Sequence, residues 1–184
     1  VNSWRAYWKN PHMPFYFVQL SSTSRLSWPW FRDSQRRLAE SLPYTAMAVS
    51  SDIGDSLDVH PRLKQPVGER LARLALHNTY NHLLTPSGPL FERAAKEGSK
   101  LIVHFKHANK LTTSDGNPLR CFEIAEDDDR FYPATAEIKG DVVVLSSKQV
   151  KHPRFVRYAW QPFTRANLVN GDKLPASTFR GEAE

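Results

Sequence analysis

The chain has 184 residues, a formal net charge of +6, and 40% hydrophobic residues. This composition is typical of a globular protein and argues against intrinsic disorder. Lys and Arg are scattered, with no block of five or six, so the charge gives no indication of nucleic-acid binding. The densest basic group, Arg32 with Arg36 and Arg37, is expected on a solvated helix face.

Two further classes of structure are disfavoured by composition. No run of 18 apolar residues occurs, so we expect no membrane span. The single cysteine, Cys121, cannot form an internal disulfide, and no Cys/His spacing resembles a zinc site.

The chain opens with VNSWRAYWKN, in which Trp4, Tyr7 and Trp8 fall at helical spacing. No charged-then-apolar signal segment is visible. The start resembles the middle of a helix. We therefore expect that part of a longer protein precedes Val1 or lies on a separate chain.

Residues 1–84 alternate strand and helix. PFYFVQL (14–20) and TAMAVS (45–50) are apolar runs of strand length, and residues 28–42 and 65–80 have helical periodicity. This order predicts an α/β fold with a parallel sheet buried on both faces. Two strands make a small sheet, so we expect its remaining strands upstream of Val1. The stripes predicted on the two helices are Phe31, Gln35, Leu38 and Leu42 on the first, and Val67, Leu71, Leu74 and Ala75 on the inner face of the second.

Residues 85–184 change to short strand-like runs separated by Gly- and Pro-containing turns. They include KLIVHFKHA, LRCFEIAE, ATAEIKG, DVVVLSS and FVRYAW. Strands spaced in this way predict an antiparallel β-sandwich, followed by a C-terminal tail.

Polar loops follow both predicted parallel strands, at the edge where ligands bind in open α/β sheets. Gln19 and the 50–60 loop are therefore predicted to face one crevice, where Gln19 is a candidate substrate-binding residue. In the stretch GDSLDVHPRLKQ, Asp58 could orient His60 as a catalytic base. A purely structural interpretation is also open: His60 precedes a helix, and Asp58 could cap backbone amides.

The stretches PFYFVQLSS, MAVSSDIGDSLDVHPRLKQPVGERLARLAL, SGPLF, VRYAWQPF and LPASTFR resemble the sialate O-acetylesterase family of SGNH hydrolases. The resemblance covers nearly the whole chain in the right order. It implies that the chain is the C-terminal half of a flavodoxin-like three-layer SGNH-hydrolase domain, with a β-sandwich after it. It also implies that His60 is the general base of a metal-free serine esterase that removes O-acetyl groups from sugars and needs no cofactor.

The sequence departs from the family at the nucleophile and at the acid. Neither a GQSN-like block nor a QGESN-like block occurs, so the resemblance places the nucleophilic serine upstream or on a partner chain. The loop serines Ser21, Ser22, Ser50 and Ser51 have no nucleophile-elbow context. Leu57 stands where the superfamily has its Asp. Asp58 is then the best candidate acid, Asp55 and Asp52 are alternatives, and a Ser–His dyad steadied by a backbone carbonyl is also open.

Two functions follow as hypotheses. In the first, the chain is the His-bearing part of an esterase acting on O-acetylated sialic acid or related sugars, incomplete and inactive alone. By resemblance, such an enzyme works in an extracellular, periplasmic or lysosome-like compartment. In the second, it is a noncatalytic carbohydrate-binding or scaffold protein that lacks the nucleophile half.

Overall fold

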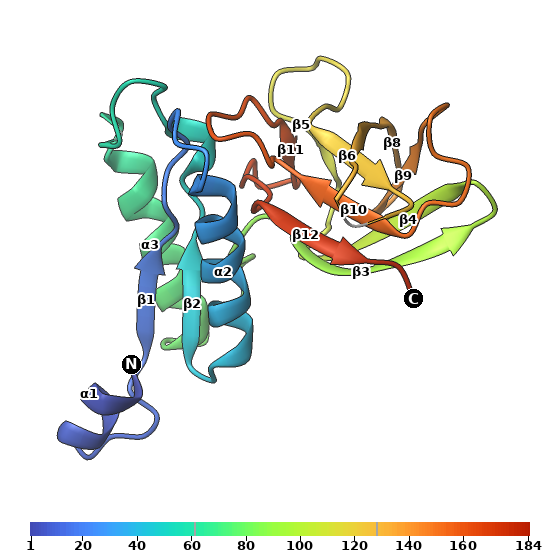
Figure 1. Cartoon of the computed structure of the whole chain (residues 1–184). Coiled ribbons are helices and arrows are strands. Elements are labelled where there is room, and N and C mark those ends of the chain that lie inside the picture. Colours follow the sequence, from blue (N-terminus) through green and yellow to red (C-terminus); the bar gives the residue numbers. More distant parts are fainter. Residues whose placement is uncertain (61, 128) are drawn as a thin grey trace.

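The first half of the chain forms a small parallel sheet with helices packed against it (Figure 1). The structure is a computed structural model that describes residues 1–60, 62–127 and 129–184. Strand β1 (Phe15–Val18) pairs in parallel with β2 (Thr45–Ala48). Helix α2 (Trp28–Ser41) connects them, and the 3-10 helix η1 (Ser51–Ile53) and helix α3 (Gln65–Asn78) follow. The predicted strand–helix–strand–helix order is confirmed.

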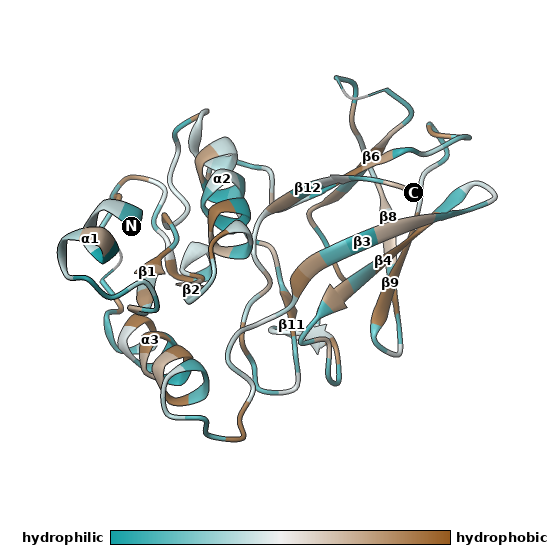
Figure 2. Cartoon of the chain, turned by 90° about the horizontal axis from the view of Figure 1, so that it is seen from below, coloured by the Kyte–Doolittle hydropathy of each residue, from teal (hydrophilic) through white to brown (hydrophobic). Residues whose placement is uncertain are grey.

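The two helices enclose the parallel pair. Figure 2 shows α2 and α3 on opposite sides of β1 and β2, whose aromatic and aliphatic residues colour as hydrophobic. In α3 the predicted inner face is correct in direction, because Leu74 is buried at 3% exposure. A short helix, α1 (Asn2–Tyr7), precedes the sheet, as the aromatic spacing at the start predicts.

The face predicted for α2 is wrong. Phe31 and Leu38 of the predicted stripe are 54% and 44% exposed. The buried residues of the helix are instead Pro29, Arg32, Asp33 and Arg36. The expectation that Arg32 and Arg36 lie on a solvated face is therefore also wrong, since only Arg37 of the three is exposed. The physical reason is that α2 contacts both the parallel pair and the strands that follow, and its polar face lies against the strands.

The second half consists of antiparallel sheets. One four-stranded sheet has the order β3-β4-β9-β8, a second has the order β12-β10-β6-β7, and β11 pairs with β5. Their bounds are β3 (Leu90–Glu97), β4 (Lys100–Lys106), β5 (Thr112–Thr113), β6 (Phe122–Ala125), β7 (Tyr132–Pro133), β8 (Thr135–Lys139), β9 (Val142–Ser146), β10 (Phe155–Tyr158), β11 (Leu168–Val169) and β12 (Phe179–Glu182). All five strand-like runs of the sequence contain one of these strands.

The two four-stranded sheets share one hydrophobic core. Val103 of β4 and Val143 of β9 meet Ile124 of β6 and Val156 of β10, and all four are fully buried. Phe179 of β12 stacks on Phe91 of β3, with ring centroids 4.5 Å apart. The fold is therefore mixed α/β, with a parallel pair in residues 1–84 (the helical part) and antiparallel sheets in residues 85–184 (the strand part).

Arg32 joins the two parts. Its side chain is fully buried, and its Nε donates to Thr178 Oγ1 at 2.9 Å. Its two terminal nitrogens donate to the carbonyl oxygens of Ala159, Gln161 and Pro162 at 2.7–2.9 Å. No carboxylate pairs with Arg32 in the described residues, so three backbone carbonyls and the Thr178 hydroxyl solvate this cation. Because these acceptors are spread over two loops, Arg32 fixes the orientation of the strand part against α2.

No helix in the described residues is long and apolar enough to cross a membrane.

Candidate active site

The loops that follow β1 and β2 lie side by side at the carboxyl edge of the parallel pair. Ser50 donates its hydroxyl hydrogen to the Gln19 carbonyl at 2.6 Å, and Ser22 donates to the Ser51 carbonyl at 2.7 Å. The predicted meeting of the two loops is therefore present in the structure. The hydroxyl groups hold the loops together where the ladder of strand hydrogen bonds has ended.

A glycine allows the second loop to approach the first closely. A Cβ placed on Gly54 would lie 2.2 Å from the carbonyl oxygen of Ser22. Further along the loop, the Ser21 hydroxyl donates to the Val59 carbonyl at 3.0 Å. The Ser21–Ser22 segment thus supports the 50–60 loop at two points, one of them directly before His60.

Asp58 and His60 are in contact within this loop. One carboxylate oxygen of Asp58 accepts from the backbone N–H of His60 at 2.8 Å and lies 3.2 Å from His60 Nδ1. The hydrogen bond from the His60 backbone N–H is the main cause of the lowered pKa of Asp58. Asp58 is therefore ionised at neutral pH, and an Nδ1–H of His60 can point at it. This tautomer leaves Nε2 free to accept a proton.

The other two candidate carboxylates have different partners. Asp52 forms a two-pronged ion pair with Arg70, at 2.7 Å for each oxygen. Asp55 accepts from the backbone N–H of Leu57 at 2.9 Å. Of the three acids, Asp58 is the one that the structure brings to His60.

The structure also bears on the purely structural interpretation, in which Asp58 only caps backbone amides. The Asp58 carboxylate caps a backbone amide two residues ahead, as an ordinary Asx turn does. The His60 side chain is 82% exposed and accepts no hydrogen bond from a serine hydroxyl in the described residues. The pair is thus an exposed, preformed acid–base contact whose third partner is not among these side chains. Pro61, the proline of the same motif, lies outside the described residues.

The four loop serines are poor nucleophiles in this arrangement. All four are buried, at 4% exposure or less. The hydroxyl groups of Ser21, Ser22 and Ser50 each donate to a backbone carbonyl. An attacking serine needs an exposed oxygen whose proton faces a base.

Gln19 lies inside the protein. Its exposure is 1%, and its amide nitrogen donates to the Arg32 carbonyl at 3.1 Å and to Ser177 Oγ at 2.9 Å. The main chain of Gln19 thus faces the 50–60 loop, while its side chain points to the strand part. The predicted role in substrate binding stays a prediction, and the contacts in the structure give Gln19 a supporting role.

Sequence reasoning did not identify the part that Arg32 and Gln19 take in joining the loops to the strand part. Two buried residues directly before β12, Ser177 and Thr178, accept these hydrogen bonds from Gln19 and Arg32. The partners lie 146 and 158 residues apart in the chain, so no local sequence pattern marks this network. In the described residues, no three His, Cys, Asp or Glu side chains gather as metal ligands.

Comparison with known proteins finds similarity among solved structures. No protein-family model and no curated protein matches the chain. Among solved structures, the chain is similar to the crystal structure of a carbohydrate acetylesterase from Xanthomonas citri, at 39% sequence identity and a TM-score of 0.91. The similarity covers 97% of this chain and 43% of that chain. This chain therefore spans less than half of the length of the esterase it resembles in sequence and in fold.

Proposed function

We propose that the chain supplies the catalytic base of a serine carbohydrate esterase that removes acetyl groups from O-acetylated sugars. The observation that carries the proposal is the 39% identity, over 97% of the chain, to a carbohydrate acetylesterase. The Asp58–His60 contact at the carboxyl edge of the parallel pair supports it, because ligands bind at this edge in α/β sheets.

The chemistry assigned to His60 is general base and then general acid catalysis. His60 Nε2 takes the proton of the attacking serine as its oxygen bonds to the acetyl carbon. His60 then returns the proton to the sugar oxygen as the C–O ester bond breaks. In the second half, His60 takes a proton from the water that attacks the acetyl carbon of the acetyl-enzyme. It returns this proton to the serine oxygen as the acyl C–O bond breaks, which releases acetate and regenerates the free serine. Asp58 holds the ring in the productive tautomer and stabilises its cation.

We infer that the nucleophilic serine lies on an upstream segment or a partner chain. In the described residues, β1 pairs only with β2, so its other edge is open to a further strand. Apolar side chains are also uncovered elsewhere in the helical part: Trp4, Tyr7 and Trp8 are 61%, 79% and 68% exposed, and Phe31 is 54% exposed. Exposed apolar surface of this extent is typical of a binding interface.

The finer description follows the family resemblance. We propose that residues 1–84 are the C-terminal portion of a sialate O-acetylesterase-like SGNH domain and that residues 85–184 are a β-sandwich domain. The substrate is then O-acetylated sialic acid or a related sugar. The test is acetate release from O-acetylated sialic acid compared with acetylated neutral oligosaccharides, measured with and without the upstream segment. Activity that needs that segment supports the proposal, and equal activity of the chain alone contradicts it.

A noncatalytic carbohydrate-binding or scaffold role is the second candidate. It is favoured by one observation: the hydroxyl groups of Ser21, Ser22 and Ser50 are committed to backbone carbonyls in the interior. A serine of an associated segment found within hydrogen-bond reach of His60 would decide for the esterase.

A further inference from the structure

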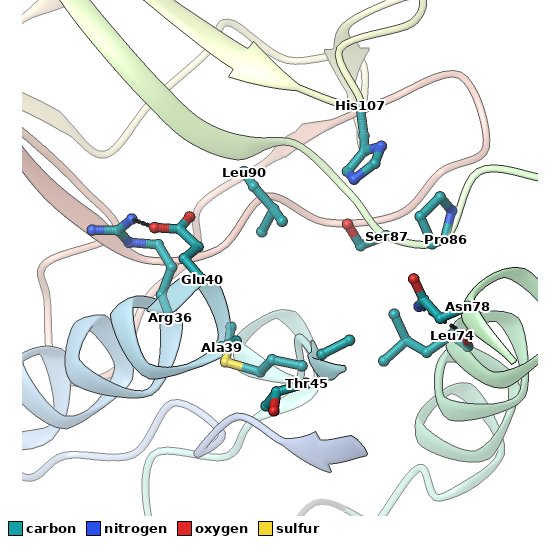
Figure 3. Close-up of a pocket in the computed structure, with 12 residues that line it drawn as sticks. Arg36, Ala39, Glu40, Thr45, Leu74, Asn78, Pro86, Ser87, Leu90 and His107 are labelled. Carbon is teal, nitrogen blue, oxygen red and sulfur yellow. Dashed lines mark hydrogen bonds and ion pairs between the residues drawn. The ribbon is translucent and has the colours of Figure 1, made fainter. Parts of the chain in front are cut away.

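A cavity of about 180 Å³ lies between α2, α3 and the start of the strand part (Figure 3). It touches β2 at Thr45, Ala46 and Met47, near the start of that strand. The His60 loop follows the other end of β2. The cavity is therefore separate from the candidate active site, and it is formed by both parts of the chain.

The size of the cavity suits a small organic molecule. An engineered cavity of about 150 Å³ in another protein stays dry when apolar and holds a benzene-sized ligand. Here the floor is apolar, with Met47 and Leu74 at 5% and 3% exposure, and Ala39 and Leu90 beside them.

Six polar side chains also line the cavity: Arg36, Glu40, Thr45, Asn78, Ser87 and His107. Figure 3 shows His107, Ser87 and Asn78 near one another, with Glu40 across the cavity beside Arg36. Asn78 uses its amide nitrogen on the Leu74 carbonyl at 2.9 Å, which leaves its amide oxygen as an acceptor. Neither ring nitrogen of His107 has a hydrogen-bond partner in the described residues.

A buried residue holds two of these groups in place. Asn170 is fully buried, and its amide nitrogen donates to the carbonyl oxygens of Ser87 and His107 at 3.0 and 3.1 Å. His107 also adopts the left-handed backbone conformation, with φ of 57°. A non-glycine residue in this region is strained and tends to occur where function requires its side chain to be placed.

The charged groups that line the cavity disfavour an ionic ligand. The Glu40 carboxylate accepts from Arg36 at 2.8 Å, so its charge is compensated, and an added cation or anion would meet a like charge from one of the pair. Burial, with His77 and Lys106 nearby, lowers the pKa of His107, so its ring is neutral at pH 7. The free groups are mainly acceptors: carboxylate and amide oxygens, and one imidazole nitrogen.

We propose that this cavity binds a small neutral polyhydroxyl molecule of the size of a single sugar unit. Hydroxyl groups donate to Glu40, Asn78 and His107, and the carbon face packs on Leu74 and Met47. Because its walls come from both parts, a bound molecule links them and raises the thermal stability of the chain.

The test measures binding of glucose, galactose, mannose and xylose to the full chain. Binding is monitored by saturation-transfer NMR and by the midpoint temperature of thermal unfolding. We expect at least one of these sugars to bind at millimolar concentration and to raise the midpoint, whereas sodium acetate does neither. Ala39→Leu, which fills the cavity, and Asn78→Ala, which removes an acceptor, should each weaken binding at least about tenfold. Ala72→Leu, an exposed change in α3, is the matched control and should leave the affinity unchanged.

Absence of binding by all four sugars overturns the proposal, and so does equal affinity in the wild type and both cavity variants. Binding of acetate in place of the sugars overturns the assigned ligand chemistry. The readout involves no ester hydrolysis, so its outcome is independent of the proposed esterase function.

Discussion

Two hydrogen-bonding contacts join Asp58 to His60. The carboxylate accepts the backbone N–H of His60, and the ring nitrogen lies 3.2 Å from the same oxygen. The first bond sets the turn, and the second fixes the ring. A catalytic carboxylate acts through the second bond alone, so substitutions can separate the two roles.

If the proposed esterase function holds, His60→Ala should lower kcat of the chain assembled with its upstream segment about a thousandfold or more, because the proton of the nucleophile then has no acceptor. The stability should hardly change, since the side chain is 82% exposed. Hydrolysis of an aryl acetate and thermal unfolding measure the two quantities. His82→Ala, another exposed histidine, is the control and should keep wild-type activity. Turnover of His60→Ala within a few-fold of the wild type would refute the assignment.

Asp58→Asn tests the charge without removing the turn. The asparagine oxygen can still accept the His60 backbone N–H, so the loop should keep its shape. Loss of the negative charge removes the preference for the productive tautomer, and kcat should fall about a hundredfold or more. Asp55→Asn, which likewise keeps its cap on Leu57, should have little effect. A severe Asp55→Asn paired with a mild Asp58→Asn would mean that Asp55 is the supporting acid.

At the scale of the elements, the close approach of the 50–60 loop to Ser22 depends on Gly54. The backbone there has φ of −72° and ψ of 169°, which alanine also adopts, so any effect of a substitution is steric. A Cβ would lie 2.2 Å from a backbone oxygen. Gly54→Ala should therefore displace the loop, cost about 1–3 kcal/mol of unfolding free energy, and lower the activity.

Gly68→Ala is the matched control for this change. Gly68 lies in α3, and an added Cβ would meet nothing within 4 Å. Alanine is the better helix former, so this variant should be about 0.5–1 kcal/mol more stable than the wild type. Chemical unfolding of both variants measures the difference. If Gly54→Ala unfolds like Gly68→Ala and keeps its activity, the close packing of the loop has no functional importance.

The sequence predicts elements better than it predicts which face is buried. The sequence predicted β1 and β2 correctly because each strand coincides with a short, uninterrupted run of apolar residues. The predicted burial of α2 was wrong because Arg32 donates to carbonyl oxygens more than 100 residues away in the chain. Arg36 pairs with Asp33 and Glu40 of its own helix, and its guanidinium lies over the ring of Phe91. Strand β3, with the sequence LFERAAKE, was also missed as a strand: its Glu, Lys and Ala favour a helix, and pairing with β4 overrides that preference.

In the candidate active site, contacts between residues close in the chain could be predicted from the sequence, whereas contacts between distant residues could not. The Asp58–His60 contact spans two residues, so the sequence could predict it. The commitment of Asp52 to Arg70 spans 18 residues and depends on the packing of α3, which the sequence pattern does not give.

At the scale of the whole molecule, Arg32 is the main polar link between the helical and strand parts. Burial lowers its pKa to about 10, and the group stays charged at neutral pH. Arg32→Met would leave the acceptors on residues 159–162 and Thr178 without this donor, at a cost of about 3–5 kcal/mol in unfolding free energy. Arg37→Met, whose side chain is 60% exposed, should cost less than about 1 kcal/mol. Similar stabilities of the two variants in urea unfolding would contradict this role of Arg32.

The central claim is that this chain supplies the base while the nucleophilic serine comes from elsewhere. The most direct measurement is to label the active esterase with a fluorophosphonate and to map the modified serine by mass spectrometry. We predict one labelled serine outside residues 1–184, with the labelling lost in His60→Ala. A label on Ser21, Ser22, Ser50 or Ser51, or full labelling without His60, would contradict the account.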